Sequence, residues 1–319
     1  MNKKIKIYIA GHRGLAGSAI ARELQSQGYT NIVTRTHAEL DLEDALATAR
    51  FFEEERPEIV FLAAAKVGGI HANNTYPVDF LMSNLLIEAN ICRVAHATKV
   101  DRLIFLGSSC IYPRDCPQPI KEEYLLTGPL EATNRPYALA KIAGIEMCWS
   151  YNRQYGTKWL AAMPTNLYGP GDNYDLNSSH VLPALIRKMH EAKVSGASEV
   201  VLWGSGKPLR EFLYVDDLAN ALVFLATLDE KRYDALVEPS LCPLINVGTG
   251  TDLTIRELAE AVASVVGYKG KFIQDTSKPD GTMRKMMDVS KIQRLGWKAN
   301  TSLREGINFT YINFCENYA

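Results

Sequence analysis

The sequence has almost no net charge, no long apolar run and no internal repeat. Its 319 residues carry 35 Lys and Arg against 36 Asp and Glu, which gives a formal net charge of -1. This balance argues against the bulk electrostatic attraction of a general nucleic-acid or anionic-membrane binder. No stretch of about 18 apolar residues occurs, so no membrane span is expected. The apolar part of the N-terminal segment is also too short for a signal peptide.

Paired cysteine motifs are absent as well. The six cysteines are scattered along the chain, and no two of them form a CxxC pair. A disulfide framework or a zinc site is therefore not expected, and no metal site is predicted. Reduced thiols and a cytoplasmic location are the expectation. The length and the hydrophobic share of 47% suffice for one large or two moderate domains.

Strand-like and helix-like segments alternate through the first half of the chain. Apolar runs predict strands at 4–11, 31–36, 58–65, 102–109 and 159–169. Helical patterns lie between them, at roughly 14–28, 41–56, 77–98 and 136–155. This alternation predicts an α/β fold with a Rossmann-type, doubly wound parallel sheet. Ligands then belong at the carboxyl ends of the strands.

A glycine motif, Gly11-His-Arg-Gly14-Leu-Ala-Gly17, follows the first predicted strand and opens the first predicted helix. Glycines at such a junction let the backbone approach a pyrophosphate, and the helix N-terminus offers free N–H groups. The spacing is GxxGxxG rather than GxGxxG, so a purely structural turn is the alternative. The position at the first strand–helix junction favours a dinucleotide site.

The end of the second predicted strand indicates which dinucleotide binds. NAD-binding proteins usually place a carboxylate there for the ribose diol, but this chain has Thr34-Arg35-Thr36-His37. Two guanidinium groups, those of Arg35 and Arg13, suit a 2′-phosphate. The sequence therefore predicts NADP(H) as the cofactor. The alternative is that Arg35 is a solvated strand end.

The chain after residue 169 becomes turn-rich and predicts a smaller, interleaved α/β substrate domain. We expect residues 1–169 and about 213–248 to form the NADP-binding domain. Residues of about 170–212 and 249–319 would form the substrate domain. Capping boxes at Thr254–Glu257 and Ser302–Glu305 predict two helix starts in that domain.

A Tyr–Lys pair, Tyr137 and Lys141, lies on one predicted helix face because its members are four residues apart. An ammonium beside a phenol lowers the phenol pKa, so Tyr137 could exchange a proton with a carbonyl oxygen as hydride moves. Alone, the pattern also fits an ordinary amphipathic helix. Ser108 and Ser109, at the end of the fourth predicted strand, could hydrogen-bond the same oxygen.

Several long stretches resemble the GDP-L-fucose synthase family of extended short-chain dehydrogenase/reductases. The resemblance runs from residue 5 to about residue 300 and includes IAGHRGLAGSAI, LAAAKVGGIHANNTYP, FLGSSCIYP, PYALAKIAGIE, MPTNLYGPGDN and WGSGKPLREFLYVDD. It implies an enzyme that inverts C3 and C5 of GDP-4-keto-6-deoxy-D-mannose and then reduces the C4 ketone with NADPH. A homodimer formed through the helices near 77–98 and 136–155 is a further expectation.

The resemblance also implies catalytic roles. Ser108, Tyr137 and Lys141 would form the reduction triad, and Cys110 and His180 the acid/base pair for epimerisation. A thiol and an imidazole both titrate near neutrality, so either can exchange protons readily. Which of the two starts as the base is open. A nearby cation such as Lys141 or a protonated His180 would raise the thiolate fraction. Taken alone, Cys110 would be a small buried hydrophobe and His180 a neighbour of a helix start.

Binding residues follow from the same resemblance and from the motifs above. The expected cofactor contacts are Gly11, Arg13, Gly14, Leu15, Gly17, Arg35, His37, Asp41, Leu42, Ala63, Ala64, Ala65, Tyr137, Lys141, Pro164, Asn166, Leu167 and His180. The expected contacts with the GDP-sugar are Ser108, Ser109, Cys110, Asn166, Arg187, Lys188, Trp203, Arg210, Asp280 and Lys285. For each of these cations, a solvated surface charge is the alternative. His37 stands where some family members carry a second basic residue, which weakens the NADPH preference and makes it sensitive to pH.

Three other functions are alternatives to the one that the resemblance implies. The nearest is a 4-epimerase or 4,6-dehydratase on the same fold that keeps its NAD bound. Dehydratases usually have an acidic pair near the serine, whereas this chain has Ser109 and Cys110 there. A binding module without catalysis would tend to lose Tyr137 or Lys141, and a structural assembly protein would need neither the glycine loop nor the triad.

Overall fold

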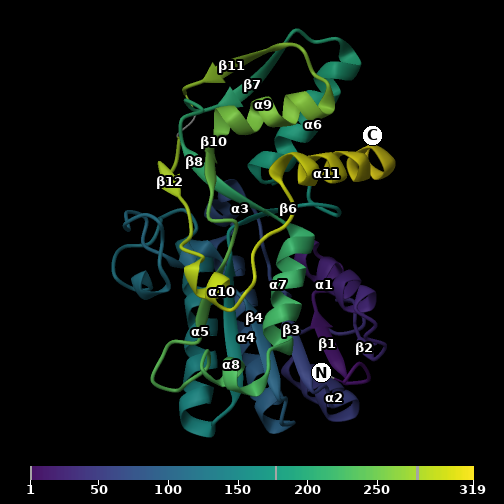
Figure 1. The fold of residues 1–319 in the computed structure, drawn as a ribbon, viewed down its shortest axis with the longest axis vertical. Helices are drawn as coiled ribbons and strands as arrows, with labels where there is room; N and C mark the ends of the chain where they lie inside the picture. The colour runs from purple at the N-terminus through teal and green to yellow at the C-terminus, as the bar shows by residue number, and fades with distance from the viewer. Residues whose placement is uncertain (1, 177, 278–279) are drawn as a thin grey trace.

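A six-stranded parallel sheet forms the centre of the protein in the computed structural model, which describes residues 2–176, 178–277 and 280–319 (Figure 1). The strand order is β2-β1-β3-β4-β5-β9, and every neighbouring pair is parallel. The strands are β1 (Ile7–Ala10), β2 (Ile32–Val33), β3 (Ile59–Leu62), β4 (Arg102–Leu106), β5 (Lys158–Pro164) and β9 (Leu244–Val247). β1, β3 and β9 are buried along their whole length, which explains their continuous apolar sequences.

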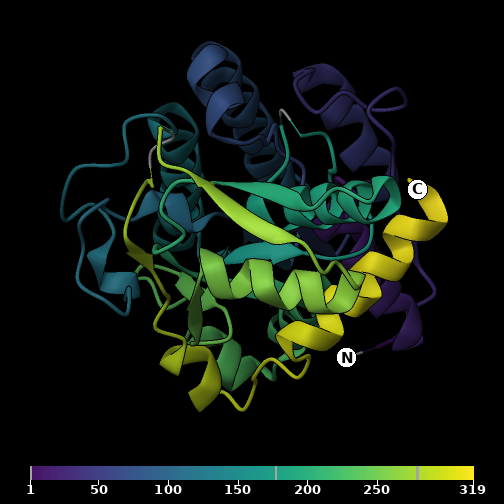
Figure 2. The ribbon, with the colours of Figure 1, turned by 90° about the horizontal axis from the view of Figure 1, so that it is seen from above.

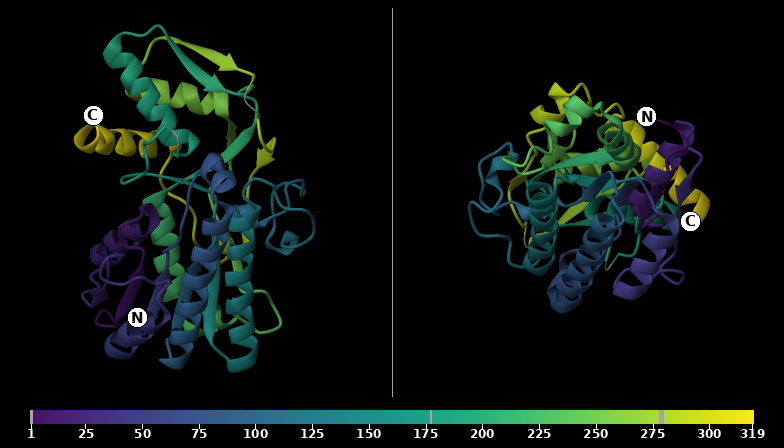
Figure 3. Two further views of the ribbon diagram at one scale, coloured as in Figure 1. Left: turned by 180° about the vertical axis from the view of Figure 1, so that it is seen from behind. Right: turned by 90° about the horizontal axis from the view of Figure 1, so that it is seen from below.

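Helices cover both faces of this sheet. One face is covered by α1 (Leu15–Ser26) and α7 (Val215–Thr227), and the other by α2 (Ala45–Glu55), α4 (Pro77–Ala97) and α5 (Arg135–Tyr155). Figure 3 shows α4 and α5 side by side from behind. Both start next to a proline, and α5 ends at Gly156, whose positive φ of 67° suits a glycine cap. The predicted doubly wound parallel fold is confirmed.

A second layer of structure lies above the main sheet (Figures 1 and 2). It has its own apolar core, formed largely by α6 (Val181–Ser195), α9 (Ile255–Val266) and α11 (Leu303–Asn317). β7 (Glu199–Trp203) pairs in parallel with β11 (Lys271–Asp275) at its far edge. The predicted capping boxes are both present and start α9 and α11.

A small sheet connects the two layers. β8 (Leu209–Tyr214) pairs with β6 (Asn166–Tyr168), β10 (Asp252–Thr254) and β12 (Arg284–Lys285). The sequence patterns did not predict β8, β10 or β12, because β10 and β12 are short and all three pair with segments that are distant in the chain. After β12 the chain returns to the lower core, where Met287, Ile292 and Trp297 are buried. The division into two domains at given residues stays a prediction.

The remaining helices are short. They are α3 (Ile70–Thr75), α8 (Glu230–Asp234), α10 (Ser290–Arg294) and two 3-10 turns at Ser109–Ile111 and Glu122–Tyr124. The fourth strand is shorter than predicted and ends at Leu106, because Ser108 caps the first 3-10 turn. Within the described part of the chain, no helix is both long enough and apolar enough to cross a membrane.

Candidate active site

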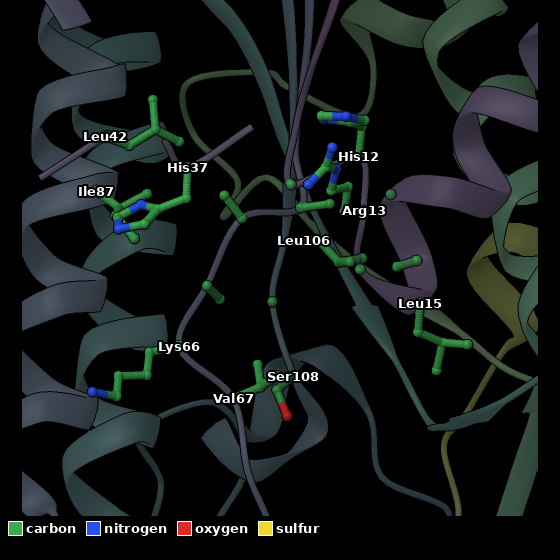
Figure 4. Close-up of a pocket in the computed structure, with 18 of the residues that line it drawn as sticks. His12, Arg13, Leu15, His37, Leu42, Lys66, Val67, Ile87, Leu106 and Ser108 are labelled. Carbon is green, nitrogen blue, oxygen red and sulfur yellow. The ribbon is translucent and has the colours of Figure 1, made fainter. Parts of the chain in front are cut away.

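A cavity of about 820 Å³ lies at the carboxyl ends of the parallel strands. Its lining comes mainly from the segments that follow β1, β2, β3, β4 and β5, together with Tyr137 and Lys141 of α5. The order of the sheet reverses between β1 and β3, which is where open α/β sheets bind their ligands. Figure 4 shows His12 and Arg13 on one side of the cavity, His37 and Leu42 on the other, and Ser108 at a distance from both.

The glycine loop has the geometry that the sequence motif predicts. Gly11 has a φ of +85°, and a Cβ there would lie 2.7 Å from the Ala64 nitrogen. A Cβ on Gly17 would lie 2.1 Å from the Gly11 carbonyl oxygen. Gly14 caps the N-terminus of α1 without a side chain in the way. The loop therefore packs against the chain after β3 and leaves helix N–H groups facing the cavity, which fits a pyrophosphate.

All three basic residues expected around a 2′-phosphate line the same cavity. Arg35 lines the cavity, and its guanidinium is fixed by Glu55 at 2.6 Å and by the Thr34 carbonyl at 2.8 Å. His37 Nδ1 lies 3.8 Å from the Asp41 carboxylate. Arg13 also lines the cavity and is exposed. These positions suit an additional phosphate, because Arg35 is oriented in advance and Arg13 is free to reach it.

All eighteen expected cofactor contacts line this one cavity. They are Gly11, Arg13, Gly14, Leu15, Gly17, Arg35, His37, Asp41, Leu42, Ala63, Ala64, Ala65, Tyr137, Lys141, Pro164, Asn166, Leu167 and His180. Their individual roles stay predictions. The size of the cavity and the glycine loop together fit a dinucleotide. Among the described residues, no three or more His, Cys, Asp or Glu side chains are arranged to hold a metal ion.

Ser108 connects two chemical groups at the inner part of the site. Its hydroxyl lies close enough to the Tyr137 phenol and to the Cys110 thiol to favour the ionised form of each, which opposes the rise of both pKa values. It also accepts a hydrogen bond of 3.4 Å from the Cys110 backbone nitrogen. This capping bond turns the chain into a 3-10 helix right after β4 and fixes the thiol beside the serine. Ser109 is buried behind it and also lines the cavity.

The ionisation of Tyr137 differs from the expectation. Burial raises the pKa of the phenol well above its ordinary value, and the charges of Cys110 and Glu88 raise this pKa further. The Ser108 hydrogen bond opposes the effect. The expected lowering of the Tyr137 pKa by Lys141 is therefore wrong for this structure. The reason lies in a contact that the sequence did not reveal: Lys141 Nζ lies 3.2 Å from the Glu88 carboxylate.

Cys110 and His180 have pKa values displaced in opposite directions. Burial raises the pKa of the Cys110 thiol, while the positive charge of Lys285, the Ser108 hydrogen bond and Lys141 oppose the rise. The His180 side chain faces the open cavity, yet the protein around it desolvates the imidazole and lowers its pKa. In the resting site the thiol is thus protonated and the imidazole neutral. Lys285, rather than His180, is the largest positive charge acting on the thiol.

Most of the expected substrate contacts gather in the upper layer. Lys188 Nζ lies 5.0 Å from the centre of the Trp203 ring, and burial lowers the pKa of this lysine. Asp280 accepts hydrogen bonds from the Ser205 nitrogen and hydroxyl, at 2.6 and 2.8 Å. Arg210 and Lys285 occupy facing positions in the β8–β12 pair. A cationic region with one exposed aromatic ring suits a nucleoside diphosphate.

Arg187 does not join this group, although it is next to Lys188 in the sequence. Its guanidinium pairs with Glu191 at 2.7 Å and donates a hydrogen bond of 3.1 Å to the Tyr174 carbonyl. It lines a different cavity, of about 830 Å³, beside the C-terminal helix. Adjacent helical residues point in directions about 100° apart, so only one of the two can face the nucleotide-sugar region. The structure brings Lys188, not Arg187, to Trp203.

Sequence reasoning missed several residues of the site. Lys66, Val67 and Ile87 line the main cavity. Glu88 lies behind it, with a side chain that is only 1% exposed. The signal for Glu88 was present as a carboxylate beside the apolar residues Leu85, Leu86, Ile87 and Ala89 of a predicted helix. Its partner, 53 residues later in the chain, could not be found from that pattern.

Known proteins with similar sequences point to one enzyme family. The pattern of the NAD dependent epimerase/dehydratase family matches residues 7–236. GDP-L-fucose synthase 1 of Arabidopsis thaliana is 57% identical over 99% of this chain and 95% of its own length. GDP-L-fucose synthase of Escherichia coli is 54% identical over 98% of both chains. A GDP-mannoheptose C4 reductase of Campylobacter jejuni, solved with NADP bound, has 41% identity and a TM-score of 0.90 over 99% of both chains.

Proposed function

This chain belongs to the NAD dependent epimerase/dehydratase family, and from that premise we propose that it acts as a GDP-L-fucose synthase. It converts GDP-4-keto-6-deoxy-D-mannose into GDP-L-fucose by inverting C3 and C5 and then reducing the C4 ketone. NADP(H) is the cofactor, in line with the NADP-bound C4 reductase and with the arginines that border the cavity. NADPH, when bound, supplies the hydride that C4 receives.

One observation carries the assignment of both reactions to a single site. The Ser108 hydroxyl lies beside both the Tyr137 phenol, a reduction residue, and the Cys110 thiol, an epimerisation residue, and it acts on the pKa of each. A C4 ketone oxygen bound at Ser108 and Tyr137 would place the adjacent carbons, C3 and C5, within the neighbourhood of Cys110. A plain C4 reductase has no chemical use for a thiol at this position.

Epimerisation requires a base on one face of the sugar and an acid on the other. The base removes the proton from C3 or C5, and the electron pair of that C–H bond moves onto the C4 oxygen to give an enolate. Ser108 and Tyr137 stabilise this oxyanion by donating hydrogen bonds. In the resting site His180 can accept a proton and Cys110 can donate one. Transfer of the thiol proton to His180 would reverse these roles, and the positive charge of Lys285 favours the thiolate.

Reduction needs a proton for the C4 oxygen as the carbon gains hydride. The Tyr137 phenol is protonated in this site, because burial raises its pKa well above the ordinary value. It can therefore donate its proton to the oxygen, and the Ser108 hydroxyl orients that oxygen. Lys141 lies on the same helix face as Tyr137, with Nζ 5.8 Å from the centre of the tyrosine ring. Its ammonium then stabilises the phenolate that remains.

The upper layer would bind the GDP part of the substrate. Lys188, Arg210 and Lys285 supply positive charge for the diphosphate, and Trp203 offers an exposed ring for stacking. Asp280 is held by Ser205 and can accept hydrogen bonds from a base edge. Arg187 is not assigned to this region, because it lines the other cavity.

A homodimer is part of the proposal. Val78, Met82 and Leu86 are exposed by 68%, 46% and 40% and follow one another every four residues along α4. Leu139 on the neighbouring α5 is 40% exposed. An apolar stripe across two adjacent helices suits a four-helix contact with a second copy. A cytoplasmic location remains an expectation from the unpaired cysteines.

The test is a reaction in deuterated water with GDP-4-keto-6-deoxy-D-mannose and NADPH, followed by mass and NMR analysis of the product. We expect deuterium at C3 and C5 of GDP-L-fucose. Tyr137→Phe should lose most of the reduction and slow the exchange much less, since reduction needs the tyrosine proton whereas the enolate keeps the Ser108 donor. Cys110→Ser should slow exchange strongly and leave reduction of an already epimerised ketone largely intact.

The same experiment can overturn the proposal. Reduction without deuterium at C3 or C5 would make the protein a plain C4 reductase, like the Campylobacter relative. Unchanged exchange in Cys110→Ser would remove the thiol from the mechanism. No reaction of the wild-type protein with this substrate, while NADPH binds, would reject the substrate assignment.

A further inference from the structure

A buried ion pair lies directly behind the candidate active site. Glu88 of α4 and Lys141 of α5 have side chains that are each 1% exposed, and Lys141 Nζ lies 3.2 Å from Glu88 Oε1. Elsewhere in the part of the chain that the structure describes, no donor makes a hydrogen bond to the Glu88 oxygens. A buried carboxylate is costly unless it is paired, so Lys141 is what makes Glu88 tolerable at this position.

The packing around the pair is built for close approach of the two helices. A Cβ on Gly144, one helical turn after Lys141, would lie 2.4 Å from Phe105 Cζ and 2.9 Å from Glu88 Oε2. Lys141 Nζ also lies 4.7 Å from the centre of the Phe105 ring. Glycine at 144 therefore leaves the space that the carboxylate and the ring occupy. The pair is enclosed between α4, α5 and β4, and Lys141 also borders the main cavity.

The other titratable groups around Glu88 belong mainly to the catalytic helix. Tyr137 and Cys148 of α5 both experience the negative charge of Glu88. On its own helix, Cys92 lies one turn further along and faces Cys148. Among the described residues, Lys141 is the cation whose charge opposes the rise of the Glu88 pKa. Burial raises the pKa of Glu88 to about 6 despite Lys141, so the carboxylate is charged at neutral pH.

We propose that Glu88 is a positioning residue for the reduction, whose carboxylate fixes the Lys141 ammonium and offsets its positive charge, so that Tyr137 serves as a proton donor and not as a base. The geometry supports both parts. The ion pair and the Phe105 contact fix the end of a flexible side chain, and the counter-charge lies between the same two helices that hold the phenol.

The offset matters because of the direction of the reaction. Reduction of a ketone needs a protonated phenol, whereas an uncompensated ammonium beside Tyr137 would favour the phenolate. A carboxylate next to the ammonium weakens this effect at the phenol and keeps the proton available. The inference rests on the proposed function only in giving Tyr137 the role of proton donor. The charge balance itself concerns the protein without ligands.

The first experiment measures how far the Glu88 charge offsets the Lys141 charge at the Tyr137 phenol, without cofactor or substrate. Phenolate absorbance is titrated from pH 7 to the alkaline limit of folding in the wild-type protein and in Glu88→Gln, each with Tyr137→Phe as the subtracted reference. The rise in the Glu88→Gln difference should begin at lower pH than in the wild-type protein, because removal of a nearby negative charge lowers the tyrosine pKa.

The second experiment measures the pH profile of single-turnover reduction. Loss of activity on the alkaline side, where the proton donor ionises, should begin at lower pH in Glu88→Gln by roughly one unit or more. NADPH affinity at pH 7 should change little, since the glutamine amide oxygen still accepts from the ammonium. Glu146→Gln makes the same chemical change on the catalytic helix, at a residue whose charge acts on Cys242 instead. Its alkaline limb should match the wild type.

A variant that removes both charges covers the case in which Glu88→Gln does not fold. Glu88→Leu/Lys141→Met leaves no unpaired buried charge, and its Tyr137 phenol should begin to ionise no earlier than in the wild-type protein. Ionisation that begins no earlier in a folded Glu88→Gln than in the wild-type protein, or earlier in the double variant, would overturn the offset. The offset would also be overturned if the alkaline loss of reduction activity shifted as much in Glu146→Gln as in Glu88→Gln. A failure of the substrate assignment would leave both titrations unaffected, so the two failures are distinguishable.

Discussion

The glycine loop allows a prediction that distinguishes an effect on folding stability from an effect on cofactor binding. In Gly17→Ala the new methyl group would lie 2.1 Å from the Gly11 oxygen and 2.6 Å from the Gly11 carbonyl carbon. Both are backbone atoms, so the loop and the start of α1 must move apart by about 1 Å to reach ordinary contact distance. Such overpacking costs about 1–3 kcal/mol. The gain of about 1 kcal/mol from alanine in place of glycine inside a helix offsets part of it.

Gly17→Ala should therefore lower the free energy of unfolding of the ligand-free protein by up to about 2 kcal/mol. A loop displaced by this amount also presents its N–H groups wrongly to the pyrophosphate. We expect NADPH to bind roughly thirtyfold more weakly, which corresponds to about 2 kcal/mol. Urea unfolding followed by tryptophan fluorescence gives the first quantity, and NADPH fluorescence titration gives the second.

Gly14→Ala is the matched control within the same motif. Its methyl group would lie 3.4 Å from the Gly11 oxygen, an ordinary contact, on the side that lines the cavity. The free energy of unfolding without ligand should change by no more than about 1 kcal/mol, the cost of alanine at a helix N-cap. NADPH affinity should still fall, because the methyl group occupies space beside the pyrophosphate. Unchanged stability of Gly17→Ala, or equal destabilisation by both substitutions, would refute this account of the loop.

Two further predictions concern assembly and pH. The wild-type protein should elute as a dimer in size-exclusion chromatography with light scattering. Met82→Glu/Leu86→Glu should be monomeric, since it places charge in the apolar stripe on α4. A monomeric wild-type protein would contradict the proposed contact. Asp172 is 6% exposed, and burial raises its pKa to about 7, so the native state binds more protons than the unfolded state between about pH 4 and 7. Stability from this group is full below pH 4 and falls by up to about 4 kcal/mol as the pH rises through 7. Asp172→Asn should therefore gain stability over the wild type at pH 8 relative to pH 5, and an equal difference in urea unfolding at the two pH values would count against the buried carboxyl.

Local patterns in the sequence were enough for the main sheet and for the cofactor cavity. Buried parallel strands have continuous apolar runs, and β1, β3 and β9 follow this rule. The capping boxes at Thr254 and Ser302 start their helices as predicted, because a cap depends on residues only three positions apart. The strands β8, β10 and β12 escaped prediction, since pairing between distant segments and not their own sequences makes them strands.

The candidate catalytic residues could be named from motifs, but their ionisation could not. The Tyr137–Lys141 spacing suggested a phenol with a lowered pKa, and the structure indicates the opposite, because burial raises this pKa and Glu88 pairs with the lysine. Cys110 gains its largest positive neighbour, Lys285, from a strand 175 residues away in the sequence. A pKa depends on burial and on charges within a few ångströms, and neither is a property of the local sequence.

What the sequence determined by itself is therefore the set of elements and the identity of the reactive groups: strand, glycine turn, helix, serine, thiol, phenol and lysine. The tertiary structure alone decided which of these groups are buried, which charges face each other and which of two adjacent basic residues turns toward Trp203. The physical reason is the range of the interactions involved. Propensity and periodicity act over a few residues along the chain, whereas desolvation and Coulomb forces act through space between segments that only the fold brings together.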